Sequence, residues 1–128
     1  MKDLKFRAWN RIVERFQFFD LKDIEKQKGQ IQWDLLEIDL YTGLRDSKGR
    51  KIFENDIIEF SCTRYYDSDP REPITKTFVS QVKYIDAAFI ISETQEDDTF
   101  LCAMNEECVI KGNIYQNKHL LKEFEIQK

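Results

Sequence analysis

The chain is poor in the residues that most often carry catalytic or metal chemistry. Its 128 residues include one histidine, three cysteines, four glycines and two prolines. A lone histidine leaves no histidine pair for a metal site or a proton relay. The cysteines lack a C-x-x-C spacing, which favours free thiols in a reducing compartment over a disulfide framework. No Walker A, dinucleotide-binding, nucleophile-elbow or zincin motif occurs. The sequence therefore predicts no cofactor and no metal.

Long apolar runs are also missing. No window approaches the ~18 apolar residues of a membrane span, and the beginning, "MKDLKFRAWN", has no apolar signal-peptide core. These absences predict a soluble protein of the cytoplasm. The net charge of −4 and the pI of about 5.1 disfavour general binding to nucleic acid. Residues 1–30, however, carry eight Lys or Arg against five acids, which leaves a basic N-terminal face open as an alternative.

The residues that are present predict one compact domain built from short strands. Hydrophobic residues make up 41% of the chain and aromatics 13%, which is enough for a buried core. "LKFRAW" alternates with period two, as do residues 31–40, where the parity switches at Leu35–Leu36 in the manner of a β-bulge. Residues 12–28 are ambiguous, and we predict a strand for their first half. Further strands are predicted in "IIEFSCT", "KTFVSQVKYI", "AFIISE", "TFLCAM" and "CVIKGNIY".

Turns and one helix complete the predicted pattern. A polar loop is predicted around "YYDSDPREP", and a hairpin turn at Asp86–Ala87. "NKHLLKEFEI" predicts a short final helix with Asn117 as its N-cap. Many short strands with turns between them favour an all-β, mainly antiparallel small barrel.

The stretch "YTGLRDSKGRKIFENDIIEF", residues 41–60, has two tight corners. Asp46 and Gly49 occupy the first and last positions of a type I turn, and a second corner follows at residues 54–56. Asp46, Glu54 and Asp56 could bind a divalent cation or act as acid and base. The structural alternative, which we favour, is that Asp46 and Asp56 accept hydrogen bonds from turn amides.

Four blocks in this order resemble the YopX family, small proteins encoded by bacteriophages and prophages: "KFRAWN", "YTGLRDSKGRKIFENDII", "VKYIDAAFII" and "IKGNIYQNKHLL". The resemblance implies a strand-rich segment over residues 1–40, an SH3-like barrel over 41–128 and no established activity. Asn55 stands where the family usually has Gly, and Asn tolerates positive φ, so we expect this corner to persist. Ala87 stands in place of a Gly in the later hairpin. Because Ala reaches positive φ only at a cost, we expect a longer turn or another type there.

Two groups of residues are candidates for a role. The first is a candidate interaction surface. Arg7 and Trp9 project together from one strand and suit either an interface or an internal contact, in which Arg7 pairs with a carboxylate such as Asp46 or Asp56. The aromatic members could form a groove for an extended peptide or cover the barrel end; they are Tyr41, Tyr65 and Tyr66. The second group is the structural signature of the corners: Gly43, Asp46, Gly49, Glu54, Asn55, Asp56, Gly112, Asn113 and Tyr115.

Three functions remain open at this stage. The leading hypothesis is a non-enzymatic protein-interaction module that acts in the bacterial cytoplasm, as a homo-oligomer and with a host or phage protein as partner. The first alternative is a nucleic-acid-binding accessory factor that uses the basic N-terminal face. The second is a metal-dependent hydrolase or nuclease that uses the corner carboxylates.

Overall fold

The computed structural model describes residues 5–27, 29–66, 69–92 and 98–121. In its first half the elements are β1 (Lys5–Asn10), β2 (Arg15–Asp20), α1 (Leu21–Lys26), the 3-10 turn η1 (Trp33–Leu35), β3 (Leu36–Arg45), β4 (Lys51–Phe53) and β5 (Asp56–Tyr66). The second half has β6 (Asp69–Gln81), β7 (Lys83–Ile85), β8 (Ala88–Ser92), β9 (Asp98–Phe100), α2 (Leu101–Met104), the 3-10 turn η2 (Asn105–Glu107) and β10 (Val109–Asn113). No described helix has the length and apolar character needed to cross a membrane. Because the described elements are mostly strands and the helices among them are short, the all-β class is confirmed.

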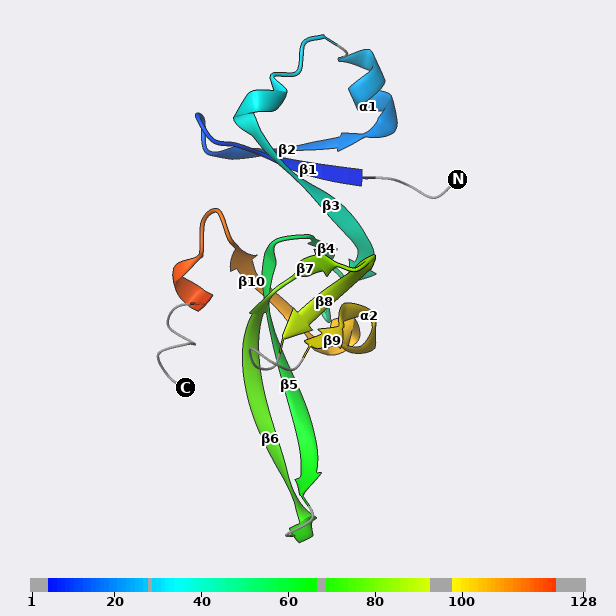
Figure 1. The fold of residues 1–128 in the computed structure, drawn as a ribbon, viewed down its shortest axis with the longest axis vertical. Helices are drawn as coiled ribbons and strands as arrows, with labels where there is room; N and C mark the ends of the chain where they lie inside the picture. The colour runs from blue at the N-terminus through cyan, green and yellow to red at the C-terminus, as the bar shows by residue number, and fades with distance from the viewer. Residues whose placement is uncertain (1–4, 28, 67–68, 93–97, 122–128) are drawn as a thin grey trace.

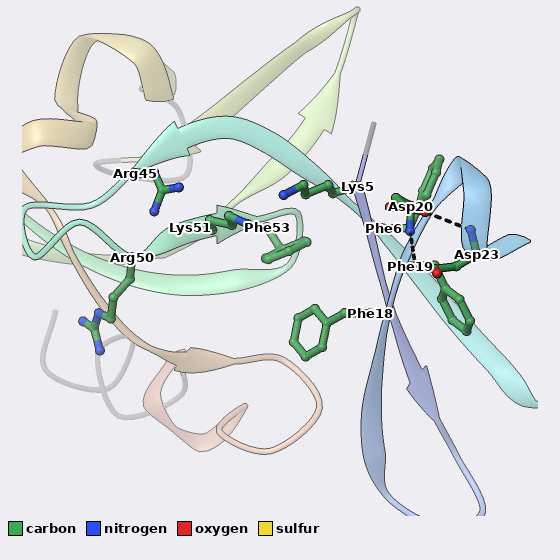
Figure 2. Close-up of a pocket in the computed structure, with 10 residues that line it drawn as sticks. All are labelled: Lys5, Phe6, Phe18, Phe19, Asp20, Asp23, Arg45, Arg50, Lys51 and Phe53. Carbon is green, nitrogen blue, oxygen red and sulfur yellow. Dashed lines mark hydrogen bonds between the residues drawn. The ribbon is translucent and has the colours of Figure 1, made fainter. Parts of the chain in front are cut away.

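The strands form three antiparallel sheets in the described part of the chain, with orders β2-β1-β3-β4, β10-β5-β6 and β7-β8-β9. Figure 1 shows the β1–β2 hairpin and α1 at one end of the molecule and the long β5–β6 hairpin extending at the other. A cleft lies between the edge strands β2 and β4 of the first sheet (Figure 2). The pairing of the described strands does not close a barrel, so the expected SH3-like barrel is not confirmed.

β3 joins the two parts that the sequence suggested. Its first half pairs with β1, where Ala8 opposes Ile38, and its second half pairs with β4, where Tyr41 opposes Phe53. The expected boundary between residues 40 and 41 therefore lies inside one continuous strand.

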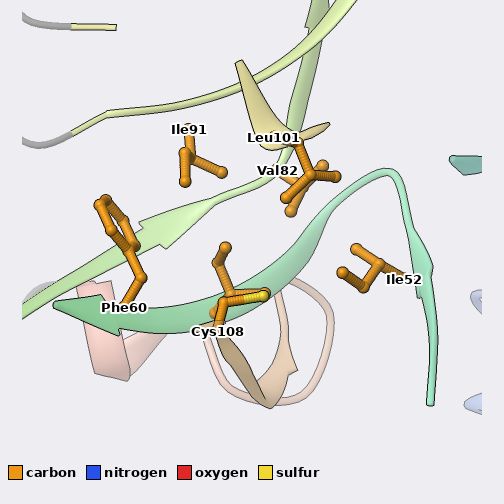
Figure 3. Close-up of a cluster of buried hydrophobic side chains, with 7 residues drawn as sticks. Ile52, Phe60, Val82, Ile91, Leu101 and Cys108 are labelled. Atoms are coloured by element: carbon orange, nitrogen blue, oxygen red, sulfur yellow. The ribbon is translucent and has the colours of Figure 1, made fainter. Parts of the chain in front are cut away.

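The hydrophobic core lies where β4, β5, β8 and α2 meet. Its members are Ile52, Ile58, Phe60, Val82, Ile91, Leu101 and Cys108, each at most 1% exposed (Figure 3). Burial of such side chains is worth about 1.5–3 kcal/mol each. A second buried group, Ala8, Trp9 and Phe19, belongs to the first sheet. The core positions the corner between β4 and β5, which carries the signature residues Glu54, Asn55 and Asp56.

Several expectations from the sequence need correction. The parity switch at Leu35–Leu36 is not a bulge, because η1 ends at Leu35 and β3 starts at Leu36. "LCAM" is the helix α2, whose Leu101 is fully buried. The tyrosines at 65 and 66 end β5, and both prolines lie in β6, so the predicted polar loop is mostly hairpin.

The ambiguous segment and the chain end follow the prediction in part. The first half of residues 12–28 contains the strand β2, as predicted. The helix α1 follows it and begins with a capping box between Asp20 and Asp23. Residues 119–121 are helical, and the amide of Leu120 donates to the carbonyl of Asn117. The rest of the predicted final helix lies outside the described residues.

The hairpin at Asp86–Ala87 is confirmed, but its predicted turn geometry is wrong. Ile85 pairs with Ala88, so the turn has only two residues. Asp86 and Ala87 have φ values of 52° and 63°, the signature of a type I′ turn. The twist of the flanking strands selects this turn, and Ala87 bears the strain. The Asn55 expectation is confirmed, since its φ is 69°.

Candidate functional site

Arg7 lies at the centre of a buried charge network. It is 5% exposed and projects from β1 across the molecule. Its Nη2 and Nε donate to Oδ2 of Asp39 over 2.9 and 3.2 Å, and its Nη1 donates to Oδ1 of Asp56 over 2.5 Å. Nη2 also donates to the carbonyl of Glu54. One guanidinium thereby joins β1, β3 and the corner before β5.

Aromatic rings enclose the same guanidinium. Its central carbon lies 4.5 Å from the ring centroid of Phe16 and 5.0 Å from that of Phe53. Trp9 packs on Phe16 and stacks on Tyr115, with centroids 5.4 Å apart. A desolvated cation over aromatic faces is stabilised by about 2 kcal/mol.

Polar groups from two further segments donate hydrogen bonds to Asp39. The hydroxyl of Tyr115 donates to its Oδ1 over 2.7 Å, and Nδ2 of Asn55 donates to the same oxygen over 2.8 Å. Asn55 in turn accepts from Nε2 of Gln81. The other carboxylate, Asp56, accepts the amide of Phe53. The network is fully paired, as a buried ionic group requires.

The environment shifts two pKa values in this network. Burial raises the pKa of Asp56 above its ordinary value, against the pull of Arg7. Burial also raises the pKa of Tyr115, and the hydrogen bond that it donates to Asp39 acts in the same direction. Tyr115 therefore stays a hydrogen-bond donor at physiological pH.

Asp46 organises the first corner. Its carboxylate accepts the amides of Lys48, Arg50 and Ile110 and pairs with the guanidinium of Arg50. Burial acts to raise the pKa of Asp46, but the amides of Ile110 and Arg50 outweigh it and the pKa is lowered. The amide of Gly49 donates to the carbonyl of Asp46, which is the predicted turn.

The structure separates the carboxylates that could have formed a catalytic set. Asp46 bonds to the turn around Arg50, Asp56 bonds to Arg7, and Glu54 accepts the amide of Leu40. Within the described part of the chain, no three His, Cys, Asp or Glu side chains are grouped to hold a metal ion. In the structure each of the three carboxylates accepts hydrogen bonds at its corner.

The other signature residues also have structural roles. A Cβ on Gly112 would lie 2.3 Å from Oδ1 of Asn117, so the strand approaches the following turn too closely for a side chain. Asn113 accepts the amides of Tyr115 and Gln116 and closes that turn. Gly43 and Gly49 have φ values of 82° and 80°.

The candidate interaction surface is only partly exposed. Arg7 and Trp9 are 5% and 8% exposed, so they are internal and not surface residues, and the structural alternative describes them. Of the two carboxylates that the sequence offered as partners of Arg7, Asp56 is the one that pairs with it, whereas Asp46 pairs with Arg50. Tyr41 is half-buried and its ring lies 5.5 Å from that of Phe53. The side chains of Tyr65 and Tyr66 lie outside the described ones.

Two cations of the basic N-terminal face are engaged within the chain. Arg7 is neutralised in the network, and Arg11 lies near Glu37 and donates to the carbonyl of Asp34. Lys2 lies outside the described residues.

A cleft of about 570 Å³ lies beside the network. Phe18 of β2 and Phe53 of β4 face each other across it, with ring centroids 5.8 Å apart in an edge-to-face contact. Four cations also line it: Lys5, Arg45, Arg50 and Lys51. Figure 2 shows Lys5 and Phe18 pointing toward Lys51 and Phe53, whereas Asp20 and Asp23 lie on the far side of β1 and β2. The open side of the cleft is basic and aromatic.

The sequence did not single out this cleft or Asp39. Phe18 is 64% exposed, which a strand pattern rich in Phe does not reveal. Asp39 carried no such signal, because it lies in phase with Glu37 between the apolar residues Leu36, Ile38 and Leu40, a pattern that places it on the polar face of the strand.

The fold is that of a small, mostly antiparallel β protein, and in this chain a buried arginine lies at its centre. The YopX protein family model matches residues 5–122, and the chain belongs to the YopX family. Its structure is similar to that of protein EF1440 from Enterococcus faecalis, with a TM-score of 0.58 and 17% identity over 92% of this chain and 97% of that one. It is also similar to protein YopX from Bacillus subtilis, with a TM-score of 0.54 and 14% identity over 94% and 97% of the chains. None of the curated proteins matches. At these identities the likeness shows the fold alone.

Proposed function

We propose that this chain is a non-enzymatic protein-interaction module that acts in the cytoplasm of a bacterial host and self-associates. The observation that carries the proposal is the outer part of the β5–β6 hairpin. β10 pairs with β5 only as far as Glu59, whereas the β5–β6 ladder continues past Thr63 and Thr75. Figure 1 shows this part extending beyond the other labelled strands.

An isolated two-stranded ribbon is marginally stable in water. The outer faces of this ribbon are exposed at Thr75, Lys76 and Thr77, and Ile74 is 48% exposed. Hydroxyl pairs tie the strands together, Ser61 with Thr77 over 3.0 Å and Thr63 with Thr75 over 2.7 Å. A β-rich ribbon with open edges is a template for another strand, and the same ribbon of a second copy fits it.

A non-enzymatic role agrees with the saturation of the buried acids. Asp39, Asp46 and Asp56 each accept at least two hydrogen bonds within the chain, which leaves none of them as an unengaged base. The contacts with Arg7 account for Asp39 and Asp56, and those with Arg50 and the turn amides account for Asp46.

The test is the mass of the protein in solution. Wild-type protein at about 50 µM, a range in which weak dimers associate, is compared with Ile74→Lys by analytical ultracentrifugation. We expect an oligomer for the wild type and a monomer for Ile74→Lys, because a lysine on an open strand edge disfavours strand pairing. Tyr84→Lys, at a 47% exposed position in β7, is the matched control and keeps the oligomer. A monomeric wild type, or no effect of Ile74→Lys, contradicts self-association through this hairpin.

A further inference from the structure

One edge of the β5–β6 ribbon is left open where β10 ends. β10 pairs with β5 as far as the pair of Val109 with Glu59, whereas β5 continues to Tyr66. Among the described strands, only β6 pairs with β5 beyond Glu59. The free edge of β5 therefore spans residues 60–66, in the ribbon that extends from the body of the molecule (Figure 1).

The main-chain groups of Ser61 and Thr63 point outward along this free edge. The amide of Val82 donates to the carbonyl of Asp56 over 2.8 Å, so the main-chain groups of Asp56 face β6. These groups alternate in direction along an antiparallel strand, and those of the odd-numbered residues 57–63 therefore face away from β6. The hydroxyl pairs that Ser61 and Thr63 form with β6 agree, because side chains lie closest at pairs without main-chain hydrogen bonds.

The opposite edge of the ribbon is less suited to strand pairing. β6 contains Pro70 and Pro73, which have no amide hydrogen, and prolines on an edge strand disfavour pairing. At its inner end β6 lies against β8, where the amide of Ser92 donates to the hydroxyl of Ser80. Residues 60–66 of β5 contain no proline, so the β5 edge is the better template for another strand.

We propose that two copies of this chain pair antiparallel through residues 60–66 of β5, about a two-fold axis at Thr63. A two-fold axis pairs the first free residue with the last, and the centre of the free edge is Thr63. In this register Cys62 lies opposite Arg64 of the second copy, and no like charges lie directly opposite each other. The inference rests on the self-association proposed above and names the strand that forms its seam.

The threonine row of the ribbon fits this pairing. Thr63 is exposed, and its hydroxyl lies 2.7 Å from that of Thr75 across the ribbon. Pairing at the seam places Thr63 opposite Thr63 of the second copy, which continues the row, and threonine pairs across strands are favourable. The two ribbons become one wider sheet, which is more stable in water than an isolated two-stranded ribbon.

Two proline variants test which edge forms the seam. Thr63→Pro removes an amide hydrogen that points to the seam and none of the β5–β6 ladder. Thr75→Pro is the matched control, because Thr75 lies opposite Thr63, loses the same hydroxyl pair and has its amide on the other edge. By analytical ultracentrifugation we expect Thr63→Pro to raise the dissociation constant of the dimer at least about tenfold and Thr75→Pro to leave it unchanged. Circular dichroism checks that both variants are folded.

A disulfide reports the register of the seam. Opposed residues without main-chain hydrogen bonds have Cα atoms about 4.5 Å apart, a separation that a disulfide spans. In a Cys102→Ser background, Arg64→Cys should therefore form a disulfide with Cys62 of the second copy on mild oxidation. A non-reducing gel shows the linked dimer, and mass spectrometry locates the bond. Cys62 alone, or Arg64→Cys combined with Cys62→Ser, is the control and should not cross-link, since each cysteine is then offset along the strand from its own copy.

The outcomes separate this seam from self-association as such. A wild-type oligomer that survives Thr63→Pro refutes the β5 seam and leaves self-association standing, and dissociation by Thr75→Pro alone assigns the seam to β6. If both prolines dissociate the dimer, absence of the disulfide overturns the proposal. A disulfide formed by Cys62 alone overturns the register.

A monomeric wild type refutes self-association itself, and the seam with it. Ile74→Lys, the variant proposed above, acts on this seam through the ribbon, since it places a lysine opposite Arg64 in the β5–β6 ladder. Like charges directly opposite each other destabilise a ladder.

Discussion

At the residue scale, Arg7 shows how one buried cation organises a small protein. Two carboxylates share it, and both are less than 4% exposed. Each of these ions loses hydration on folding, and only their mutual hydrogen bonds compensate for that loss. Removing the cation therefore leaves two buried negative charges together, which destabilises the fold more than replacing the whole network with apolar residues would.

Arg7→Met is expected to lower the free energy of unfolding by about 3–5 kcal/mol. Urea unfolding followed by far-UV circular dichroism measures the change. Arg11→Met is the control, because Arg11 is about half exposed and lies 3.9 Å from Glu37, a pair worth less than about 1 kcal/mol. Equal effects of the two substitutions would show that the buried network does not carry this stability.

Asp46 makes stability depend on acid pH. Its pKa is lower in the folded state than in the unfolded chain, so its contribution is present above the unfolded value near 3.8 and is lost as the pH falls through the folded pKa. Asp46→Asn is expected to cost about 2–4 kcal/mol at pH 7 and progressively less below about pH 4. Urea unfolding at a series of pH values measures this difference, and a gap that is constant with pH contradicts the assignment.

At the element scale, the hairpin between β7 and β8 shows a turn chosen by its strands. A two-residue connection between antiparallel strands favours a type I′ or II′ turn, and in the type I′ turn seen here both residues have positive φ, which Ala87 adopts at a cost. Local preference alone predicts another turn, but the ladder from Lys83–Ile90 to Ile85–Ala88 leaves no room for it.

Ala87→Gly is expected to raise the free energy of unfolding by about 1 kcal/mol, because glycine adopts positive φ without strain. Ala88→Gly, one residue into β8, is the control and is expected to lower it by about 0.5–1 kcal/mol. Thermal unfolding of both variants shows the difference in sign, and a destabilised Ala87→Gly would mean that the turn is not strained.

At the scale of the whole molecule, the charge network joins segments that lie far apart in the sequence. Arg7 is in β1, Asp39 in β3, Asp56 in β5, and Tyr115 follows β10. Because β3 also runs without interruption between two pairing partners, the N-terminal segment and the remainder should share one cooperative transition.

We expect the unfolding of both halves to coincide. Trp33→Phe leaves Trp9, which is 8% exposed, as the fluorescence probe of the first half. Cys108 reports the second half, since it is fully buried and its burial raises the pKa of the thiol to about 11. The urea midpoint measured by thiol labelling of Cys108 should therefore equal the midpoint measured by Trp9 fluorescence. The exposed Cys102 is replaced in a Cys102→Ser background so that it does not contribute to the labelling. Midpoints that differ would indicate two separately folding domains.

The strands were predictable where their side chains alternate and the signal is local, as in β1 and β8. Short apolar runs were not, because "LCAM" suits a buried strand or a buried helical turn equally well until the core places Leu101. At Leu35–Leu36, a bulge and a short 3-10 turn produce the same switch of parity. The corner residues Asp46, Gly49 and Asn55 were predictable, since the amides or φ values that they serve lie within a few residues.

The sequence by itself determined the all-β class, the family and the turn chemistry of the corners, because these depend on contacts between near neighbours. Only the tertiary structure decided that Arg7 is internal, that Asp39 and Asp56 share it, and that β2 and β4 face each other across a basic cleft. Those features arise because the first sheet curls and because Arg7 approaches Asp39 and Asp56, which lie 32 and 49 positions away from it in the sequence. Such approach depends on how whole elements pack, and no local pattern of residues encodes it.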